Sequence, residues 1–224
     1  MRKFPVTILD NFYENPDLVR QFALSLDSST DSAGRWPGKR TSPLHEVNQS
    51  FFNTFCNKLF NLFYDLDYHN LNYRVSTTFQ TISNYSEDSN SKLNIGWIHS
   101  DDKYIFSGVI YLNPNPSEHA GTNIYNRIDG EDNGLTQSEK FKLYKGEELV
   151  NESEYTDQIL ENNNKFEETV SIKNVYNRMI LFEGGVYHGV PSYYSSSPEP
   201  RLTQVFFVHA VAGARCPIVR SKVA

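Results

Sequence analysis

The sequence predicts a mainly β fold, a sandwich or jelly roll with helices packed on one face. Three observations favour this class. From Asn72 onward, short segments of alternating apolar and polar residues are separated by turns rich in glycine and proline. Before Asn72, apolar residues recur at helical spacing in two segments. Aromatic residues are abundant, with 15 Phe, 14 Tyr and 2 Trp, and these side chains pack well on pleated sheets.

Residues 1–70 are expected to form a helical support for the sheets. Asn15-Pro16 is typical of a helix start, because proline is favoured at the first helical position. The aromatic stripe of the second helix is typical of a surface that faces a core. A polar loop at residues 28–41 carries Trp36, which either anchors the loop by packing or contacts a substrate. The expected elements are a strand at residues 4–9 and helices at residues 16–27 and 48–65.

The remaining chain is predicted to form the β core, over about residues 73–211. A polar insert at about residues 128–165 interrupts this core, with a short helix or hairpin near residues 139–144. Neither an internal repeat nor a linker divides the sequence, so we expect one domain over residues 1–224. The expected strands cover residues 73–83, 93–101, 104–112, 121–125, 168–175, 178–182, 186–191 and 201–211.

Composition argues against several function classes. The net charge of -6 gives no basic face for nucleic-acid phosphates, so nucleic acid is not expected as a partner. No apolar run reaches the roughly 18 residues of a membrane span, so no membrane association is expected. Cys56 and Cys216 form no disulfide framework, and the N-terminus has no secretory h-region, which favours a reducing, cytoplasmic location.

His99 and Asp101 are the first candidate site residues. Alternation through Leu93 to Asp101 predicts a strand, on which residues two apart project to the same face. An imidazole beside a carboxylate makes two thirds of the 2-His-1-carboxylate set that suits non-haem Fe(II). A His-x-Asp tripeptide by itself also occurs by chance, so its significance depends on the rest of the chain.

His188 is the second candidate histidine. It follows Gly184-Gly185, which would let the backbone turn sharply between two strands. A histidine in this position is either structural or a ligand. Several antiparallel strands separate His188 from Asp101, enough to return the chain to the same place. The remaining histidines are expected to lie outside the site, because a fourth protein ligand would close positions that catalysis needs. They are His45, His69, His119 and His209.

Arg201 begins an apolar strand, so it is expected to be buried and to need an anionic partner. That partner is either a protein carboxylate or the carboxylate of a ligand, which a guanidinium binds through two parallel hydrogen bonds. The hydroxyl of Thr203 lies on the same strand face and could bind the same group.

In order and spacing, these motifs resemble the Fe(II)- and 2-oxoglutarate-dependent oxygenase superfamily, most closely its prolyl-4-hydroxylase-like branch. The resemblance covers about residues 73–211 and includes Tyr111-Leu112-Asn113 and Gly121-Thr122. The segment from Asp10 to Pro16 also resembles the start of uncharacterised bacterial and phage proteins. The sequence departs from the family at Ala120, where glycine is usual, and in its long polar insert, so the substrate cannot be carried over.

The resemblance implies a double-stranded β-helix, the cupin-like form of the jelly roll, in which His99, Asp101 and His188 hold Fe(II). The cosubstrate 2-oxoglutarate would pair its C5 carboxylate with Arg201, helped by Thr203 and Tyr111. Ascorbate is a further candidate cofactor. The implied activity is a dioxygenase that hydroxylates a C–H bond of a peptide, amino acid or small metabolite and releases succinate and CO2.

Two side chains near the metal ligands, Trp97 and Gln80, are expected either to contact substrate or to pack in the core. Two other functions remain open. One is a cupin-type metalloenzyme that does not use 2-oxoglutarate, which Arg201 and Thr203 argue against. The other is a non-enzymatic jelly roll, such as a binding or phage structural module, in which the three ligands would not converge or would hold no metal. Nothing in the sequence indicates an oligomeric state.

Overall fold

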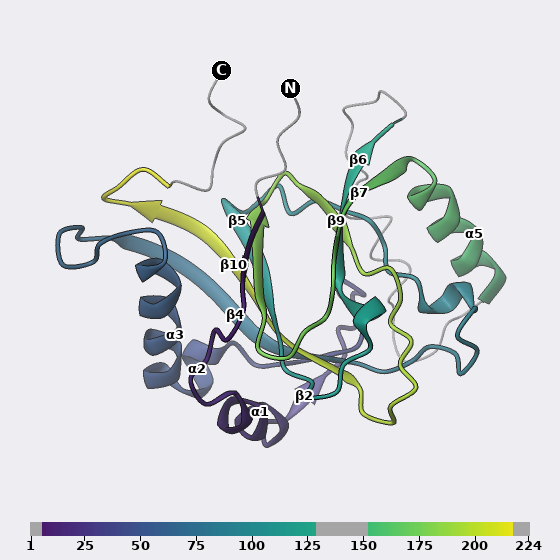
Figure 1. Cartoon of the computed structure of the whole chain (residues 1–224), viewed down its shortest axis with the longest axis horizontal. Helices are drawn as coiled ribbons and strands as arrows, with labels where there is room; N and C mark the ends of the chain where they lie inside the picture. Colours follow the sequence, from purple (N-terminus) through teal and green to yellow (C-terminus); the bar gives the residue numbers. More distant parts are fainter. Residues whose placement is uncertain (1–5, 129–151, 217–224) are drawn as a thin grey trace.

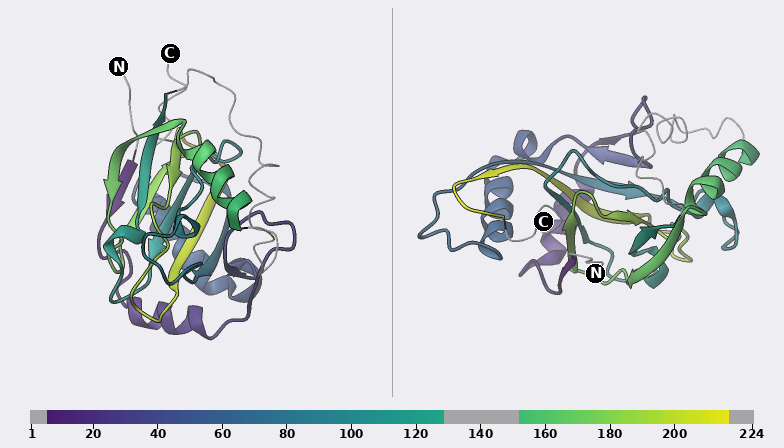
Figure 2. Two further views of the ribbon diagram at one scale, coloured as in Figure 1. Left: turned by 90° about the vertical axis from the view of Figure 1, so that its right-hand side faces the viewer. Right: turned by 90° about the horizontal axis from the view of Figure 1, so that it is seen from above.

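A computed structural model describes residues 6–128 and 152–216, and Figures 1 and 2 show their arrangement. The predicted class is confirmed: the chain is mainly β, with helices beside two antiparallel sheets. The larger sheet has the strand order β1-β8-β5-β10-β4-β3-β2, and the smaller has the order β7-β6-β9. Strands distant in sequence are therefore neighbours in space, as a jelly roll requires. The strands are β1 (Val6–Leu9), β2 (Ser28–Ser29), β3 (Lys39–Thr41), β4 (Asn72–Ile82), β5 (Phe106–Tyr111), β6 (Thr122–Arg127), β7 (Phe166–Ile172), β8 (Met179–Glu183), β9 (Tyr187–Gly189) and β10 (Arg201–Ala212).

The helices gather at two places in the molecule. Figure 1 shows α1, α2 and α3 at one side and α5 at the opposite side, beside the smaller sheet. The side chain of Asn48 accepts a hydrogen bond from the backbone N–H of Phe51 at 3.0 Å, which caps α3. The expected N-terminal helices are thus present with shorter bounds. The helical elements are α1 (Pro16–Leu24), α2 (Leu44–Val47), α3 (Gln49–Asn61), α5 (Glu152–Asn163) and the 3₁₀ turns η1 (Lys92–Asn94) and η2 (Glu118–Ala120).

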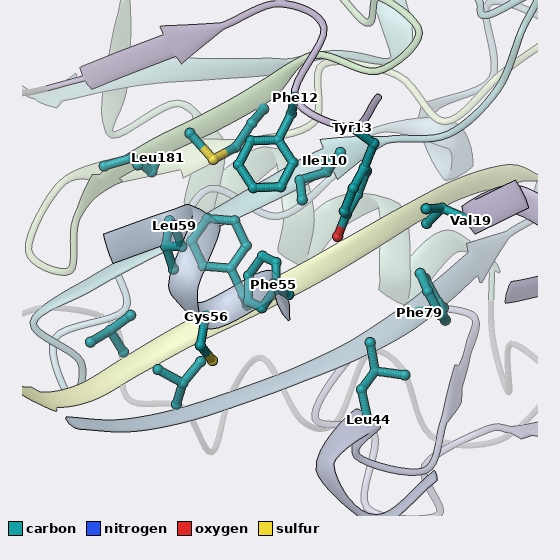
Figure 3. Packing of buried hydrophobic residues seen from close by; sticks show 14 of the residues in the cluster. Phe12, Tyr13, Val19, Leu44, Phe55, Cys56, Leu59, Phe79, Ile110 and Leu181 are labelled. Carbon is teal, nitrogen blue, oxygen red and sulfur yellow. The ribbon is translucent and has the colours of Figure 1, made fainter. Parts of the chain in front are cut away.

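Side-chain alternation along the larger sheet separates two apolar layers. On β8, Met179 and Leu181 face the helices, whereas Ile180 and Phe182 face the smaller sheet. Figure 3 shows the helix-side layer, in which Phe55 and Leu59 of α3 approach side chains of the sheet. The layer between the sheets contains Tyr111, Ile124, Ile172, Ile180 and Phe182. On β10, Arg201, Val205 and Phe207 lie on the opposite side of the sheet from the helices, and the alternation ends at a register shift between Val208 and Ala210.

Three expectations need correction. Residues 93–101 do not form a strand: η1 occupies the start, and only His99 makes an isolated antiparallel bridge, to His188. The 28–41 loop contains the short strands β2 and β3. The polar insert contains α5, whose sequence has few apolar residues to indicate a helix. The helix or hairpin expected near residues 139–144 lies outside the described residues.

Candidate functional site

His99, Asp101 and His188 converge, although they come from separate parts of the chain. Their ligand atoms all lie within 4.8 Å of one another. The Nε2 atoms of His188 and His99 lie 3.5 Å and 3.9 Å from the two carboxylate oxygens of Asp101. Reciprocal backbone hydrogen bonds between His99 and His188, at 3.0 and 2.8 Å, place the two imidazoles side by side. Two imidazole nitrogens and one carboxylate form the facial set that suits non-haem Fe(II).

Both imidazoles have the tautomer that metal binding requires. The Nδ1 atom of His99 lies 2.9 Å from the carbonyl oxygen of Trp97, and that of His188 lies 2.9 Å from the carbonyl oxygen of Val186. A carbonyl can only accept, so each Nδ1 must carry the proton. In the neutral imidazole each Nε2 then carries the lone pair, and each Nε2 faces Asp101. Such backbone partners orient metal-binding histidines and raise their basicity.

Close backbone packing holds Asp101 in place. Its N–H donates to the carbonyl of Gly184 at 2.7 Å, and its own carbonyl accepts from the N–H of Tyr104 at 2.8 Å. A Cβ on Gly184 would collide with the carbonyl oxygen of Tyr104. Gly184 and Gly185 do not have positive φ. The turn expected between two strands is present at Gly184-Gly185, between β8 and β9, and the N–H of Val186 closes it by donating to the carbonyl of Glu183 at 2.9 Å. Glycine is required at position 184 by close approach of the backbone.

Along the segment that leads to His99, two asparagine side chains make the hydrogen bonds to the backbone that a neighbouring strand would otherwise make. The amide of Asn162 donates to the carbonyl of Ile98 at 3.0 Å. The amide of Asn163 accepts from the N–H of Ile98 at 3.1 Å and donates to the carbonyl of Gly96 at 2.9 Å. These contacts satisfy backbone groups that a strand pairing would otherwise satisfy. Both asparagines lie at the end of α5, and the sequence patterns gave no sign of this function.

We expect Asn162→Ala to weaken metal binding without removing a ligand. Asn162 is buried, and its loss leaves the Ile98 carbonyl without this partner, which costs about 1–3 kcal/mol of unfolding free energy. Fe(II) affinity should fall roughly 10-fold, as for other partners that orient ligands. Anaerobic metal titration and urea unfolding measure the two effects. The control is Asn164→Ala, at an exposed neighbouring residue, and an equal loss in both variants would contradict the positioning role.

A cavity of about 410 Å³ joins the three-ligand group to Arg201. His99, Asp101, His188 and Arg201 all line it. Arg201 is buried, and its Nε donates to the carbonyl of Ala120 at 2.8 Å. Because the acceptor is a backbone carbonyl, alanine at position 120 can provide it as well as the glycine that is usual in the resembled family. Within the described part of the chain, no carboxylate lies within 4.0 Å of the Arg201 guanidinium.

Thr203 and Tyr111 lie behind Arg201 and not on the cavity wall. The Tyr111 ring centroid lies 5.5 Å from the guanidinium carbon, and the Tyr111 hydroxyl donates to Thr122 at 2.9 Å. Burial raises the pKa of Tyr111 and lowers that of Arg201. The hydroxyl of Thr203 is buried and has no hydrogen-bond partner among the described residues. A buried guanidinium that has no carboxylate partner among the described residues suits the carboxylate of a ligand.

Trp97 and Gln80, the two residues expected near the ligands, both line the cavity. Trp97 is buried and packs with Leu93 and Ile159, and its carbonyl accepts from His99. The Gln80 amide donates to the carbonyl of Pro37 at 2.7 Å, so it anchors the 28–41 loop. Trp36 of that loop lines the cavity as well.

The other histidines lie outside the ligand group. His45, His69 and His119 are exposed, as expected. His209 is partly buried, and its Nε2 lies 2.9 Å from the hydroxyl of Ser76.

This architecture is the fold of the 2-oxoglutarate-dependent oxygenases, including prolyl hydroxylases. The chain is similar to a prolyl hydroxylase from Trichoplax adhaerens in complex with a peptide fragment of hypoxia inducible factor, with a TM-score of 0.51 and 13% identity over 92% of this chain and 84% of that one. It is also similar to HygX from Streptomyces hygroscopicus with nickel and 2-oxoglutarate bound, with a TM-score of 0.51 and 10% identity over 91% and 82%. The epimerase SnoN from nogalamycin biosynthesis gives a TM-score of 0.50 and 11% identity over 100% and 87%.

The chain belongs to the family of unknown function DUF6445, whose model matches residues 1–207. Curated protein sequences give no match. Within the described ranges, no helix is both long and apolar enough to cross a membrane.

Proposed function

We propose that this protein is an Fe(II)- and 2-oxoglutarate-dependent dioxygenase that hydroxylates a C–H bond of a peptide, amino acid or small metabolite. One observation carries the proposal: a single cavity is lined both by a two-histidine, one-carboxylate group and by a buried guanidinium that has no counter-ion among the described residues. A metal centre with an anion site beside it is what binding a metal-chelating dicarboxylate requires.

His99, Asp101 and His188 hold Fe(II) in this proposal. Their three donors leave coordination positions open to other ligands. Bound Fe(II) and 2-oxoglutarate supply the oxidising chemistry: one atom of O2 enters succinate, CO2 leaves, and the other oxygen atom becomes the new hydroxyl of the substrate. The protein supplies position and environment.

Arg201 binds the C5 carboxylate of 2-oxoglutarate. The hydrogen bond to Ala120 and the contact with the Tyr111 ring fix the guanidinium. Thr203 does not line the cavity, so no contact with the cosubstrate is assigned to it. Tyr111 therefore acts through Arg201 and need not touch the cosubstrate. Fixing the second carboxylate in this way orients the other end of the molecule towards the three ligands.

The class of substrate is inferred from the volume of the cavity and from the molecules bound in similar structures. The cavity volume of about 410 Å³ falls in the range of small-molecule sites. Among the similar structures, one hydroxylase is in complex with a peptide fragment and HygX has hygromycin B bound. A cupin-type metalloenzyme that does not use 2-oxoglutarate would have no need for the unpaired Arg201. A non-enzymatic jelly roll would have no need for three convergent ligands.

Thermal unfolding tests cosubstrate binding. A ligand that binds only the native state stabilises it, by about 2.7 kcal/mol at 100 times its dissociation constant. We expect 2-oxoglutarate to raise the melting temperature when a divalent metal is present. Succinate should resemble buffer, because it lacks the keto group. No shift with metal and 2-oxoglutarate together would contradict the proposal.

A succinate-release screen then tests the reaction. Peptides, free amino acids and small metabolites would be supplied with Fe(II), 2-oxoglutarate, O2 and, in a parallel set, ascorbate. A true substrate should release succinate in step with its own gain of one oxygen atom, and Asp101→Ala should release none. Equal release by Asp101→Ala would show that the activity does not belong to this site.

A further inference from the structure

A second guanidinium faces the same cavity, and the proposed reaction does not use it. Arg40 lies on β3, which pairs with β4 so that Arg40 stands opposite Gln80. Arg40 and Trp36 both line the cavity. The Arg40 guanidinium carbon lies 4.7 Å from the centroid of the Trp36 ring. The two side chains therefore form one patch of cavity wall, here called the Arg40–Trp36 patch.

Among the described residues, nothing accepts from two buried N–H donors of the Arg40–Trp36 patch. The Arg40 side chain makes one hydrogen bond to a described residue, a long one of 3.4 Å to the side-chain oxygen of Gln80. Its Nε is buried without a partner in the described part of the chain, and so is the indole Nε1 of Trp36. Buried donors are normally satisfied, because an unpaired one costs about 1–3 kcal/mol. Two donors without partners on stacked side chains, one of them cationic, suit an oxyanion acceptor.

The charged side chains that line the cavity also favour an anionic ligand. Although the whole chain has a net charge of -6, cationic side chains outnumber carboxylates among the described residues that line the cavity. Arg35 is neutralised by Asp31 through contacts of 2.9 and 2.8 Å, whereas no carboxylate of the described residues pairs with Arg40. Burial lowers the pKa of Arg40 to about 10, so the guanidinium is charged at neutral pH. The charged lining residues are Arg35, Arg40, Lys103, Arg201, Asp101 and Asp102.

The loop that carries the Arg40–Trp36 patch is fixed to the sheet. Gly38 has a φ of +67°, and a Cβ there would collide with the carbonyl oxygen of Thr81. The side chain of Gln80 donates to the carbonyl of Pro37 at 2.7 Å. A site held in this way needs little ordering when a ligand binds.

We propose that the Arg40–Trp36 patch is a second anion site, which binds a carboxylate, phosphate or sulfate group of the primary substrate. Its role in recognising substrate rests on the proposed function. Arg201 holds the cosubstrate, and Arg40 selects substrates that carry an acidic group at a distance from the C–H bond to be oxidised. The fork of Arg40 and the indole N–H of Trp36 donate to the same oxyanion.

The test follows the indole N–H of Trp36 by two-dimensional NMR. The chain has only two tryptophans, Trp36 and Trp97, and Trp97→Phe assigns their signals. The protein would hold Zn(II), which has no unpaired electrons, and saturating 2-oxoglutarate, so that Arg201 is occupied. Inorganic sulfate and acetate are the probe oxyanions, titrated at constant ionic strength against chloride. We expect the Trp36 signal to shift saturably with both probes.

Arg40→Gln should weaken sulfate binding at least about 10-fold, the effect of losing a charged hydrogen-bond partner. Arg40→Lys keeps the positive charge but loses the planar guanidinium, so its affinity for sulfate should lie between those of the wild type and Arg40→Gln. The matched control, Lys39→Gln, removes one charge from an exposed neighbour that does not line the cavity and should bind as the wild type does. Dispersion of the same spectra shows whether each variant is folded.

Three outcomes would overturn the proposal. They are a Trp36 signal that does not move, equal binding by Arg40→Gln and Lys39→Gln, and loss of 2-oxoglutarate binding in Arg40→Gln but not in Arg201→Gln. The last would place the cosubstrate at Arg40. Failure of the proposed function is distinguishable, because 2-oxoglutarate would then fail to bind while Arg40-dependent sulfate binding persisted.

Discussion

Asp101→Ala should abolish measurable Fe(II) binding while the protein stays folded. Asp101 is the one carboxylate of the group, with oxygens 3.5 Å and 3.9 Å from the Nε2 atoms of the two imidazoles. Its removal takes away the one negative charge among the three donors. Loss of a residue that merely orients a ligand weakens metal binding 10- to 100-fold, so loss of a ligand should weaken it more than about 100-fold. Anaerobic titration with Fe(II) measures the change.

Asp102→Ala is the matched control for Asp101→Ala. Asp102 is the next carboxylate along the chain, it also lines the cavity, and it does not belong to the ligand group. Its removal should leave Fe(II) affinity within a few-fold of wild type. If both variants lost metal equally, general cavity charge rather than coordination would explain the binding.

Arg201→Leu should have opposite effects on cosubstrate binding and on the stability of the protein without ligands. Affinity for 2-oxoglutarate should fall by about 2–5 kcal/mol, the cost of losing one partner of a buried charged pair. Without cosubstrate, the wild type holds a buried guanidinium that lacks a counter-ion among the described residues, and leucine, although shorter, removes the cost of burying that charge. The unfolding free energy of ligand-free Arg201→Leu should therefore equal or exceed that of wild type.

Arg178→Leu provides the contrasting case. Arg178 makes two contacts with the carboxylate of Asp10, at 2.6 and 2.9 Å, and this interaction lowers the pKa of Asp10. Its loss should reduce stability by about 1 kcal/mol and leave 2-oxoglutarate affinity unchanged. Urea unfolding and calorimetric titration test both variants. A large stability loss in Arg201→Leu with unchanged cosubstrate affinity would assign Arg201 to the structure alone.

Alternation of apolar and polar residues was sufficient to predict the long strands and their faces. On β10, Arg201, Val205 and Phe207 line the cavity, whereas Leu202, Phe206 and Val208 join the helix-side core. Period-two arguments succeed here because β10 pairs on both edges with regular register over Thr203–Val208. The two helices that pack on the sheet also follow from their apolar spacing.

The same argument failed where side chains replace backbone pairing. Residues 93–101 alternate as a strand does, but buried Asn94 fixes their start by donating to the carbonyls of Ser86 and Asp88, at 2.9 and 3.1 Å. Farther along the segment, the side chains of Asn162 and Asn163 hydrogen-bond to the backbone of Ile98, where a neighbouring strand would otherwise pair. Hydrogen bonds between amide side chains and a distant backbone leave no periodic pattern in the sequence.

The candidate site was only partly accessible to sequence analysis for a similar reason. His99, Asp101, His188 and Arg201 belong to motifs whose order along the chain can be compared with a family. Arg40 belongs to no such motif, and its unpaired Nε is visible only once β3 is placed beside β4. Residues that depend on a particular loop arrangement have to be found in the structure.

One cavity should bind Fe(II) through His99, Asp101 and His188 and bind 2-oxoglutarate through Arg201. Anaerobic visible absorption detects both events together, because a keto acid chelated to Fe(II) gives a weak charge-transfer band. We expect the band to form when 2-oxoglutarate is added to the Fe(II)-loaded protein and to be absent in His99→Ala and Asp101→Ala. In Arg201→Leu it should require a much higher 2-oxoglutarate concentration. A wild-type protein that binds Fe(II) but gives no band at saturating 2-oxoglutarate would show that this cavity is not a 2-oxoglutarate site.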